Sequence, residues 1–323
     1  MTDILTRDHG GAVDRAIAQY GGTPADWLDL STGINPKAYP LPEISRRDWT
    51  TLPGQDASLQ LLDAARGFWR VPQRVDILAA NGASALIAMV PNLVPAGTVS
   101  IPEPTYNEHA AGFRNAGWQV IPELTAAEGL VVVHPNNPDC RLWSLPEMDV
   151  GSRALVIIDE SFCDVAPDKS LVDLCERPNI IVLKSIGKFW GLAGLRLGFA
   201  MGHPSAIAKL RELLGPWPVS GPALTIGHAA LSDQNWAQDS RMLLASACQR
   251  MDAMLEKCGV SFVGGTDLFR LYRVADAADF HRTLAAHHIL CRIFPYSKHW
   301  VRLGLPGSKS DWGRLERALS DLE

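Results

Sequence analysis

The residues best suited to chemistry lie in one stretch, 184–198, with the sequence KSIGKFWGLAGLRLG. It holds two lysines, Lys184 and Lys188, with Ser185 between them and Arg196 further along. A lysine amine can attack a carbonyl compound, and a hydroxyl beside a guanidinium suits a phosphate. Lys184 still belongs to the preceding apolar run. Lys188 follows it in a polar turn, where it can reach a ligand.

Other polar side chains follow apolar runs in the same way. Asp159 ends the run 154–158, and a buried acid needs a cationic partner or a protonated nitrogen; an ordinary salt bridge is the alternative. Asn137 lies in HPNNPDC, where prolines aim an amide unless the segment is only a structural turn. Tyr106 offers an aromatic face, although a core position is the alternative reading for this residue alone.

A further set of small residues, Gly82, Ala83 and Ser84, opens a helix after another run. Backbone N–H groups there can face a phosphate, although Ser84 could be an ordinary N-cap. Together, these strand-end residues suit a phosphate, a ring face, a ring hydroxyl, a protonated ring nitrogen and an amine nucleophile. That set describes pyridoxal 5'-phosphate (PLP), in which an acid keeps the ring nitrogen protonated so that the ring accepts electrons.

A sheet is needed to bring these residues to one edge. Short β-branched runs alternate with helix-like segments through the middle of the chain, which predicts an α/β fold with a mainly parallel sheet. The expected strands are 75–79, 98–101, 130–134, 154–159, 179–184 and 197–201, and the expected helices include 84–90 and 106–116. In such sheets, ligands bind outside the carboxyl ends of the strands.

The character of the chain changes after the Pro/Gly-rich stretch 215–222, where we place a domain junction. Helical periodicity then dominates 223–258, followed by two short strand signals and a closing helix, which indicates a smaller α+β domain. The predicted parts are an N-terminal segment, 1–36, that packs on the small domain, a large PLP-binding domain, 37–215, and a small C-terminal domain, 216–323.

Composition excludes several classes of protein. The formal net charge is −5, with no basic stripe, so we expect no nucleic-acid partner. The six cysteines are scattered without a CxxC pair, which favours reduced thiols in a cytoplasmic protein over disulfides or a metal site. No apolar run approaches the roughly 18 residues of a membrane helix, and the N-terminus lacks the pattern of a signal peptide.

The ordered motifs NGAS, PTY, NNP, DESF, SIGKFWGLAGLRLG and VRLG resemble the fold-type-I PLP enzymes of the class I and II aminotransferase superfamily. The resemblance implies the PLP-dependent transferase fold of type I, with a mainly parallel seven-stranded sheet in the large domain. It also implies that Lys188 is the Schiff-base lysine and that Lys184 is structural. It also implies a set of cofactor contacts: Ser185, Arg196 and the amides of Gly82, Ala83 and Ser84 for the phosphate, Tyr106 for the ring face, Asn137 for the ring hydroxyl, and Asp159 for the pyridine nitrogen.

Within that superfamily the chain is similar to the threonine-phosphate decarboxylases of cobalamin biosynthesis. The similar stretches are HGG at 9–11, DLSTGINP at 29–36, KFWGLAGLRLG, and CRIFPYSKHWVRLGLPG at 291–307. The resemblance implies that Arg302 binds the substrate carboxylate. It implies a phosphate site formed by Arg292 with three N-terminal residues, His9, Gly33 and Asn35; for Arg292, a surface or salt-bridged position is the alternative.

This resemblance predicts PLP-dependent decarboxylation of L-threonine O-3-phosphate to (R)-1-aminopropan-2-ol O-phosphate by a homodimer. Two alternatives stand beside it. Histidinol-phosphate aminotransferases share many of these motifs, and the direction of bond cleavage at Cα is not readable from sequence. PLP folds also serve as ligand sensors fused to DNA-binding domains, although this chain keeps the lysine, acid, asparagine and arginine set.

Four positions depart from the family pattern. Phe162 replaces a tyrosine that donates to the ring hydroxyl, Gly187 replaces the common serine before the lysine, and Cys140 replaces a glycine. Leu52 aligns with a tyrosine that reaches the cofactor phosphate of the neighbouring subunit. The resemblance therefore leaves open what a second subunit adds to the site.

Overall fold

The computed structural model describes residues 9–321, which form two compact units. The larger unit comprises residues 38–239, and the smaller unit comprises the segments on either side of it. The boundary after residue 239 falls later than the junction predicted at 215–222, because the helix that follows this stretch packs within the larger unit. Within residues 9–321, no helix is both long enough and apolar enough to cross a membrane.

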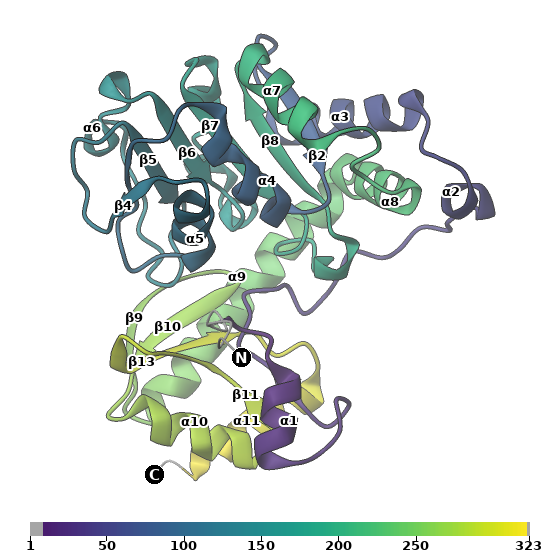
Figure 1. The fold of residues 1–323 in the computed structure, drawn as a ribbon. Coiled ribbons are helices and arrows are strands. Elements are labelled where there is room, and N and C mark those ends of the chain that lie inside the picture. The colour runs from purple at the N-terminus through teal and green to yellow at the C-terminus, as the bar shows by residue number, and fades with distance from the viewer. Residues whose placement is uncertain (1–8, 322–323) are drawn as a thin grey trace. The chain divides into compact units, whose positions relative to one another are not determined.

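The larger unit is built on a seven-stranded sheet in the order β2-β8-β7-β6-β5-β3-β4 (Figure 1). Its strands are β2 (Asp76–Ala80), β3 (Thr98–Ser100), β4 (Gln119–Ile121), β5 (Gly129–Val133), β6 (Leu155–Asp159), β7 (Ile180–Ser185) and β8 (Gly198–Gly202). Only β8 runs against its neighbours, β2 and β7, so six strands point the same way. The predicted mainly parallel, seven-stranded α/β sheet is confirmed.

The central strands are apolar because both of their faces are covered. Every residue of β5 and β6 is buried, as expected for strands inside a parallel sheet. Each of the six predicted strands agrees with an observed strand to within one or two residues. The sequence analysis missed β4, a three-residue edge strand that begins with the exposed Gln119 and carries too short an apolar pattern.

Helices cover both faces of this sheet. They are α2 (Arg46–Thr50), α3 (Gln55–Trp69), α4 (Ala83–Met89), α5 (Asn107–Asn115), α6 (Leu145–Met148), α7 (Pro204–Leu214), α8 (Gly221–Ser232) and the first residues of α9 (Gln234–Lys257). Short 3-10 turns are η1 (Val90–Leu93), η2 (Val150–Ser152), η3 (Cys163–Val165), η4 (Pro167–Lys169), η5 (Val172–Glu176) and η6 (Ala193–Leu195). Leu86 of α4, Phe113 of α5 and Leu210 of α7 pack into one core with the sheet. On the other face, Trp69 of α3 packs edge-on against Phe199 of β8, and α8 packs on α3.

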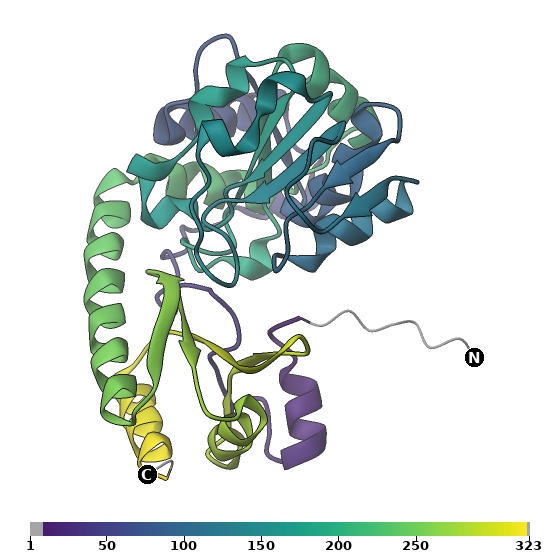
Figure 2. The same ribbon diagram turned by 90° about the vertical axis from the view of Figure 1, so that its left-hand side faces the viewer.

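The smaller unit contains an antiparallel sheet in the order β12-β13-β10-β9. Its strands are β9 (Ser261–Thr266), β10 (Phe269–Arg273), β12 (Arg292–Phe294) and β13 (Ser297–Gly304), and a separate parallel pair joins β1 (Leu28–Asp29) to β11 (Ile289–Leu290). Its helices are α1 (Val13–Tyr20), α10 (Ala277–Ala286), α11 (Lys309–Ser320) and the rest of α9, which Figure 2 shows as one long helix. The β1–β11 pair ties the N-terminal segment to the C-terminal part of the chain.

Gly198 is the tightest point between the sheet and α4, since a Cβ on it would overlap the backbone of Gly82 and Ala83. We expect Gly198→Ala to lower the free energy of unfolding by about 1–3 kcal/mol, because the strand and the helix must separate. Urea denaturation measures this change. Gly194→Ala is the matched control, since a Cβ there meets nothing within 4 Å. Equal effects of the two substitutions would contradict this account of the packing.

Candidate active site

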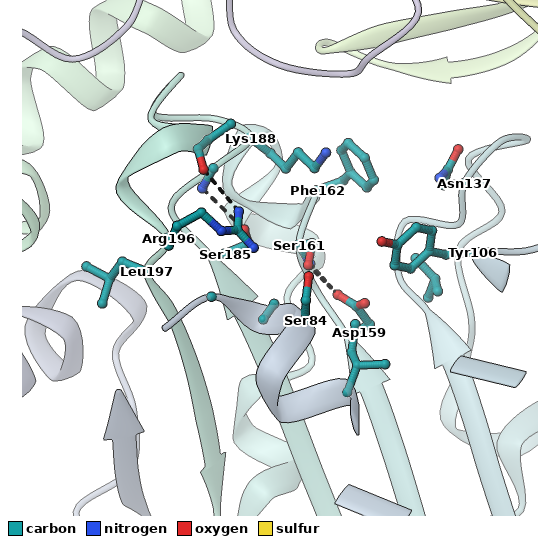
Figure 3. A pocket seen from close by; sticks show the side chains of 16 residues that line it. Ser84, Tyr106, Asn137, Asp159, Ser161, Phe162, Ser185, Lys188, Arg196 and Leu197 are labelled. Atoms are coloured by element: carbon teal, nitrogen blue, oxygen red, sulfur yellow. Dashed lines mark hydrogen bonds between the residues drawn. The ribbon is translucent and has the colours of Figure 1, made fainter. Parts of the chain in front are cut away.

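A pocket of about 190 Å³ lies at the edge of the large sheet where the six codirectional strands end (Figure 3). The structure brings together in its lining all nine residues that the sequence predicts for the cofactor. They are Gly82, Ala83, Ser84, Tyr106, Asn137, Asp159, Ser185, Lys188 and Arg196. The other lining residues are Ile87, Val133, Ser161, Phe162, Gly187, Ala193 and Leu197.

Successive strands deliver these side chains. Asp159 is the last residue of β6 and Ser185 the last of β7. Tyr106 caps the start of α5, in the connection that leaves β3. Lys188 and Arg196 lie in the connection between β7 and β8. The pocket therefore follows from strand direction, as expected for ligand sites of open α/β sheets.

One end of the pocket suits a phosphate. Gly82 has a φ of 96°, a backbone conformation that favours glycine, and a Cβ there would lie 2.8 Å from Arg196 Nη2, so the guanidinium would have to shift. Arg196 is oriented by a hydrogen bond from its Nη1 to the carbonyl of Ala193 (3.0 Å). The Ser185 hydroxyl oxygen accepts from the Gly187 amide (3.2 Å), which leaves its proton to donate. A cation, a hydroxyl and the backbone at Gly82 thus gather at one end.

A buried carboxylate lies at another side of the pocket. Asp159 Oδ1 accepts from the amide and the hydroxyl of Ser161 (2.9 and 2.5 Å), and Oδ2 lies 2.8 Å from His109 Nε2. Burial opposes ionisation, but the hydrogen bond and charge of His109, with the bonds from Ser161, outweigh it and lower the pKa of Asp159. The Asp159 carboxylate therefore carries the negative charge that can pair with a protonated ring nitrogen.

His109 is a site residue that the sequence analysis missed. It is fully buried in α5, and its ring packs edge-on against Tyr106, with the ring centroids 6.0 Å apart. The available signal was its position three residues after Tyr106 in PTYNEH, one helical turn away. Its contact with Asp159 crosses 50 positions of sequence, so no local pattern reveals it.

The two lysines of the 184–198 stretch have different surroundings. Lys184 Nζ is fully buried and pairs with Glu160 (2.6 Å) and Asp164 (3.5 Å). Burial opposes its charge, but the two carboxylates outweigh burial and raise the pKa of Lys184, so it stays protonated and is a poor nucleophile. Lys188 is half-buried and lines the pocket, with its Nζ 5.3 Å from the ring centroid of Phe162.

The positions that depart from the family pattern have local explanations in two cases. Cys140 has a φ of 64°, a left-handed conformation that glycine adopts more readily, which accounts for the usual glycine at this place. Phe162 is buried against the pocket and offers no hydrogen-bond donor. Leu52 is 67% exposed in the larger unit. A Cβ at position 187 would lie 3.2 Å from the Cα of Ala193, closer than an ordinary contact, which favours glycine there.

In the smaller unit, the two arginines predicted to bind anions are cross-strand neighbours. Arg292 of β12 lies directly opposite Arg302 of β13 in the strand register, so both side chains are on one face of the sheet. Arg302 is buried, and its Nη2 donates to the carbonyl of Ser31 (2.6 Å). Burial and, secondly, the positive charge of Arg292 lower the pKa of Arg302 to about 10, so its guanidinium is still charged at neutral pH.

The predicted N-terminal substrate residues lie in two touching segments of the same unit. The amide of Gly11 donates to the Ser31 hydroxyl (2.7 Å), which places the segment after His9 against the one that contains Gly33. His9 is exposed and Gly33 is buried. Asn35 is also buried, and its side-chain oxygen accepts from the Lys37 amide (2.9 Å).

One buried trio in the larger unit, His134, Glu160 and Cys163, has atoms close enough for a metal ion. Those atoms already have other partners. His134 Nε2 lies 2.8 Å from the Lys169 carbonyl and its Nδ1 accepts from the Trp143 amide. Glu160 pairs with a lysine and accepts two further hydrogen bonds. We therefore assign these residues to internal hydrogen bonds and ion pairs rather than to a metal site.

The sheet, and a pocket that holds Lys188, Asp159 and an end suited to a phosphate, fit the class of PLP-dependent enzymes with the aminotransferase type of fold. The chain belongs to the aminotransferase class I and II family, whose pattern it matches over residues 122–319. It is 39% identical to a threonine-phosphate decarboxylase of Sinorhizobium sp, over 98% of both chains, and 38% identical to one of Pseudomonas aeruginosa, over 97% of both. The crystal structure of the L-threonine-O-3-phosphate decarboxylase of Porphyromonas gingivalis shares the fold, with a TM-score of 0.72 and 18% identity over 90% of this chain and 98% of that one.

We expect His109→Phe to weaken PLP binding by roughly tenfold to a hundredfold, because Asp159 loses a charge-assisted hydrogen bond and its pKa rises. Titration of the apo-protein with PLP, followed by absorbance, measures the dissociation constant. His281→Phe, which replaces a half-buried histidine of α10 in the smaller unit, is the control for the substitution itself. Unchanged PLP affinity of His109→Phe would show that Ser161 alone holds the acid.

Proposed function

We propose that this protein catalyses the PLP-dependent decarboxylation of L-threonine O-3-phosphate to (R)-1-aminopropan-2-ol O-phosphate in cobalamin biosynthesis. The observation that carries the choice of substrate is the pair of arginines opposite each other on β12 and β13. The near full-length similarity to two threonine-phosphate decarboxylases supports the same reaction.

The arginine pair favours a ligand with two anionic groups. Like charges directly opposite each other in a sheet are destabilising, and Arg302 is also buried. An anion bound at these guanidinium groups relieves both costs, because a guanidinium binds a carboxylate or a phosphate through two parallel hydrogen bonds. L-Threonine O-3-phosphate carries one group of each kind. We assign its carboxylate to Arg302 and its phosphate to Arg292, together with His9, Gly33 and Asn35.

The residues of the pocket hold the cofactor in this proposal. Lys188 attaches it and moves a proton at the substrate Cα. Arg196, Ser185 and the amides of Gly82, Ala83 and Ser84 bind its phosphate; Tyr106 stacks on the ring and Asn137 bonds the ring hydroxyl. Asp159, held ionised by His109 and Ser161, keeps the ring nitrogen protonated. Bound PLP supplies an electron sink for the bond broken at Cα.

The two arginines also select the reaction. A substrate held at its carboxylate and at its phosphate has little freedom to rotate about the bonds at Cα. Its orientation then decides which bond at Cα is broken. This is where a decarboxylase and an aminotransferase with the same pocket residues differ.

We further propose that the protein is a cytoplasmic homodimer. All six cysteines lie in the described part of the chain and none of them forms a disulfide, in keeping with a reducing compartment. In the larger unit, a pocket of about 350 Å³ lies between the start of α3 and the segment after α7, and the exposed Trp217 lines it. Pro53 also lines this pocket, and the residue before it, Leu52, is exposed. Exposed apolar surface of this kind favours a protein partner. Sedimentation velocity of the PLP-loaded protein tests the dimer.

Incubation with PLP and L-threonine O-3-phosphate, with and without 2-oxoglutarate, tests the reaction. Aminopropanol phosphate and carbon dioxide formed without any oxo acid are the expected products by mass spectrometry. Glutamate formed only with 2-oxoglutarate, and no carbon dioxide, would overturn the decarboxylase assignment. It would favour an aminotransferase, for which histidinol phosphate is the next substrate to test.

Substitution of the arginines tests their assignment. We expect Arg292→Leu to lower kcat/KM for L-threonine O-3-phosphate by roughly a hundredfold through lost phosphate contacts, and to affect unphosphorylated L-threonine far less. Steady-state kinetics with both substrates gives this comparison. Arg282→Leu, which removes an exposed arginine of α10, is the control. Equal losses on the two substrates would contradict a phosphate role for Arg292.

A further inference from the structure

A buried cluster of charged groups lies behind the strand ends that carry the pocket. Successive side chains of a strand point to opposite faces, so Lys184 points away from the face of Ser185. Lys184 Nζ lies 2.6 Å from Glu160 Oε2 and 3.5 Å from Asp164 Oδ1. All three side chains are at most 3% exposed.

The connection that carries Lys188 joins this cluster through Trp190. The indole Nε1 of Trp190 donates to Asp164 Oδ2 (3.2 Å), while Trp69 Nε1 donates to Asp164 Oδ1 (2.8 Å). Trp190 is fully buried, and its ring stacks on Trp236 at a centroid distance of 5.1 Å and an interplanar angle of 13°.

Three members of the cluster are close in sequence to a residue of the pocket. Glu160 follows Asp159, and Lys184 precedes Ser185. Trp190 comes two residues after Lys188. The cluster therefore holds, from the far face of the sheet, the three chain segments that present the acid, the hydroxyl and the amine.

Packing alone does not require these groups. Two carboxylates and one ammonium are costly to bury, and apolar side chains of similar volume fill such a space without that cost. A hydrogen-bonded polar network instead fixes one arrangement of its chain segments. The segment between β7 and β8 needs such fixing, since it contains Gly187, Gly191 and Gly194.

We propose that Trp190 is a positioning residue for Lys188, acting through its hydrogen bond to Asp164 and thereby through the pair of Lys184 with Glu160. The proposal rests on the role of Lys188 as the cofactor lysine in the proposed function. It does not depend on which bond of the substrate is broken.

The test uses Trp190→Phe, which removes the indole N–H and keeps an aromatic ring. The matched control is Trp118→Phe: Trp118 is 4% exposed and its Nε1 donates to the Pro91 carbonyl (3.0 Å), among residues that do not line the pocket. PLP is added to each apo-protein, its covalent linkage is followed by absorbance, and borohydride trapping with peptide mapping locates the lysine. Thermal unfolding is measured on the same samples.

Trp190→Phe is expected to slow linkage at Lys188 by roughly tenfold, the effect of losing one hydrogen bond to a charged group. Trp118→Phe is expected to leave this rate unchanged while lowering the unfolding temperature by a similar amount. Equal linkage rates in the two variants would overturn the proposal, because the indole N–H of Trp190 would then contribute only to stability.

Asp164→Asn supplies the second measurement. If Trp190 acts through Asp164, Trp190→Phe slows linkage much less in the Asp164→Asn background than in the native one. Additive effects of the two substitutions would overturn the proposed route. Trapping of PLP at a residue other than Lys188 in the native protein would overturn this proposal together with the role of Lys188, whereas trapping at Lys188 without decarboxylation would overturn the reaction alone and leave the positioning role intact.

Discussion

The chemistry of the larger unit depends on one constraint, that six of the seven strands end at the same edge of the sheet. Each strand is too apolar to carry a reactive group in its middle, so polar side chains occur where the strands stop. The shared direction then brings Asp159, Ser185 and the residues after the other strands into a pocket of about 190 Å³. Only β8 is reversed, so it begins at this edge, two residues after Arg196.

Local electrostatics gives side chains of the same type different roles. Of two lysines four positions apart, Lys184 is held protonated by buried carboxylates, and Lys188 is left to face the pocket. Asp159 remains ionised despite its burial because His109 and Ser161 bond both of its oxygens. In the smaller unit, by contrast, two groups of like charge, Arg292 and Arg302, lie opposite each other on neighbouring strands. In the proposed function, a substrate with two anionic groups offsets that repulsion.

The pocket also shows why fold and family do not settle the reaction. A decarboxylase and an aminotransferase need the same lysine, acid and phosphate contacts, since both use the cofactor as an electron sink. The distinction lies in how a substrate is held at its two ends. That is why the arginine pair of the smaller unit, rather than the pocket residues, carries the proposed function.

The sequence by itself determined the α/β fold, six of the seven strands of the large sheet and all nine lining residues proposed for the cofactor, because each leaves a local signal where an apolar run stops. It did not reveal β4, the pairing of β1 with β11, or the boundary after residue 239, which depend on neighbours in space. Nor did it reveal His109 beside Asp159 or Trp190 beside Asp164, whose partners are 50 and 26 positions away. Such contacts have no periodicity along the chain, so only the tertiary structure decides them.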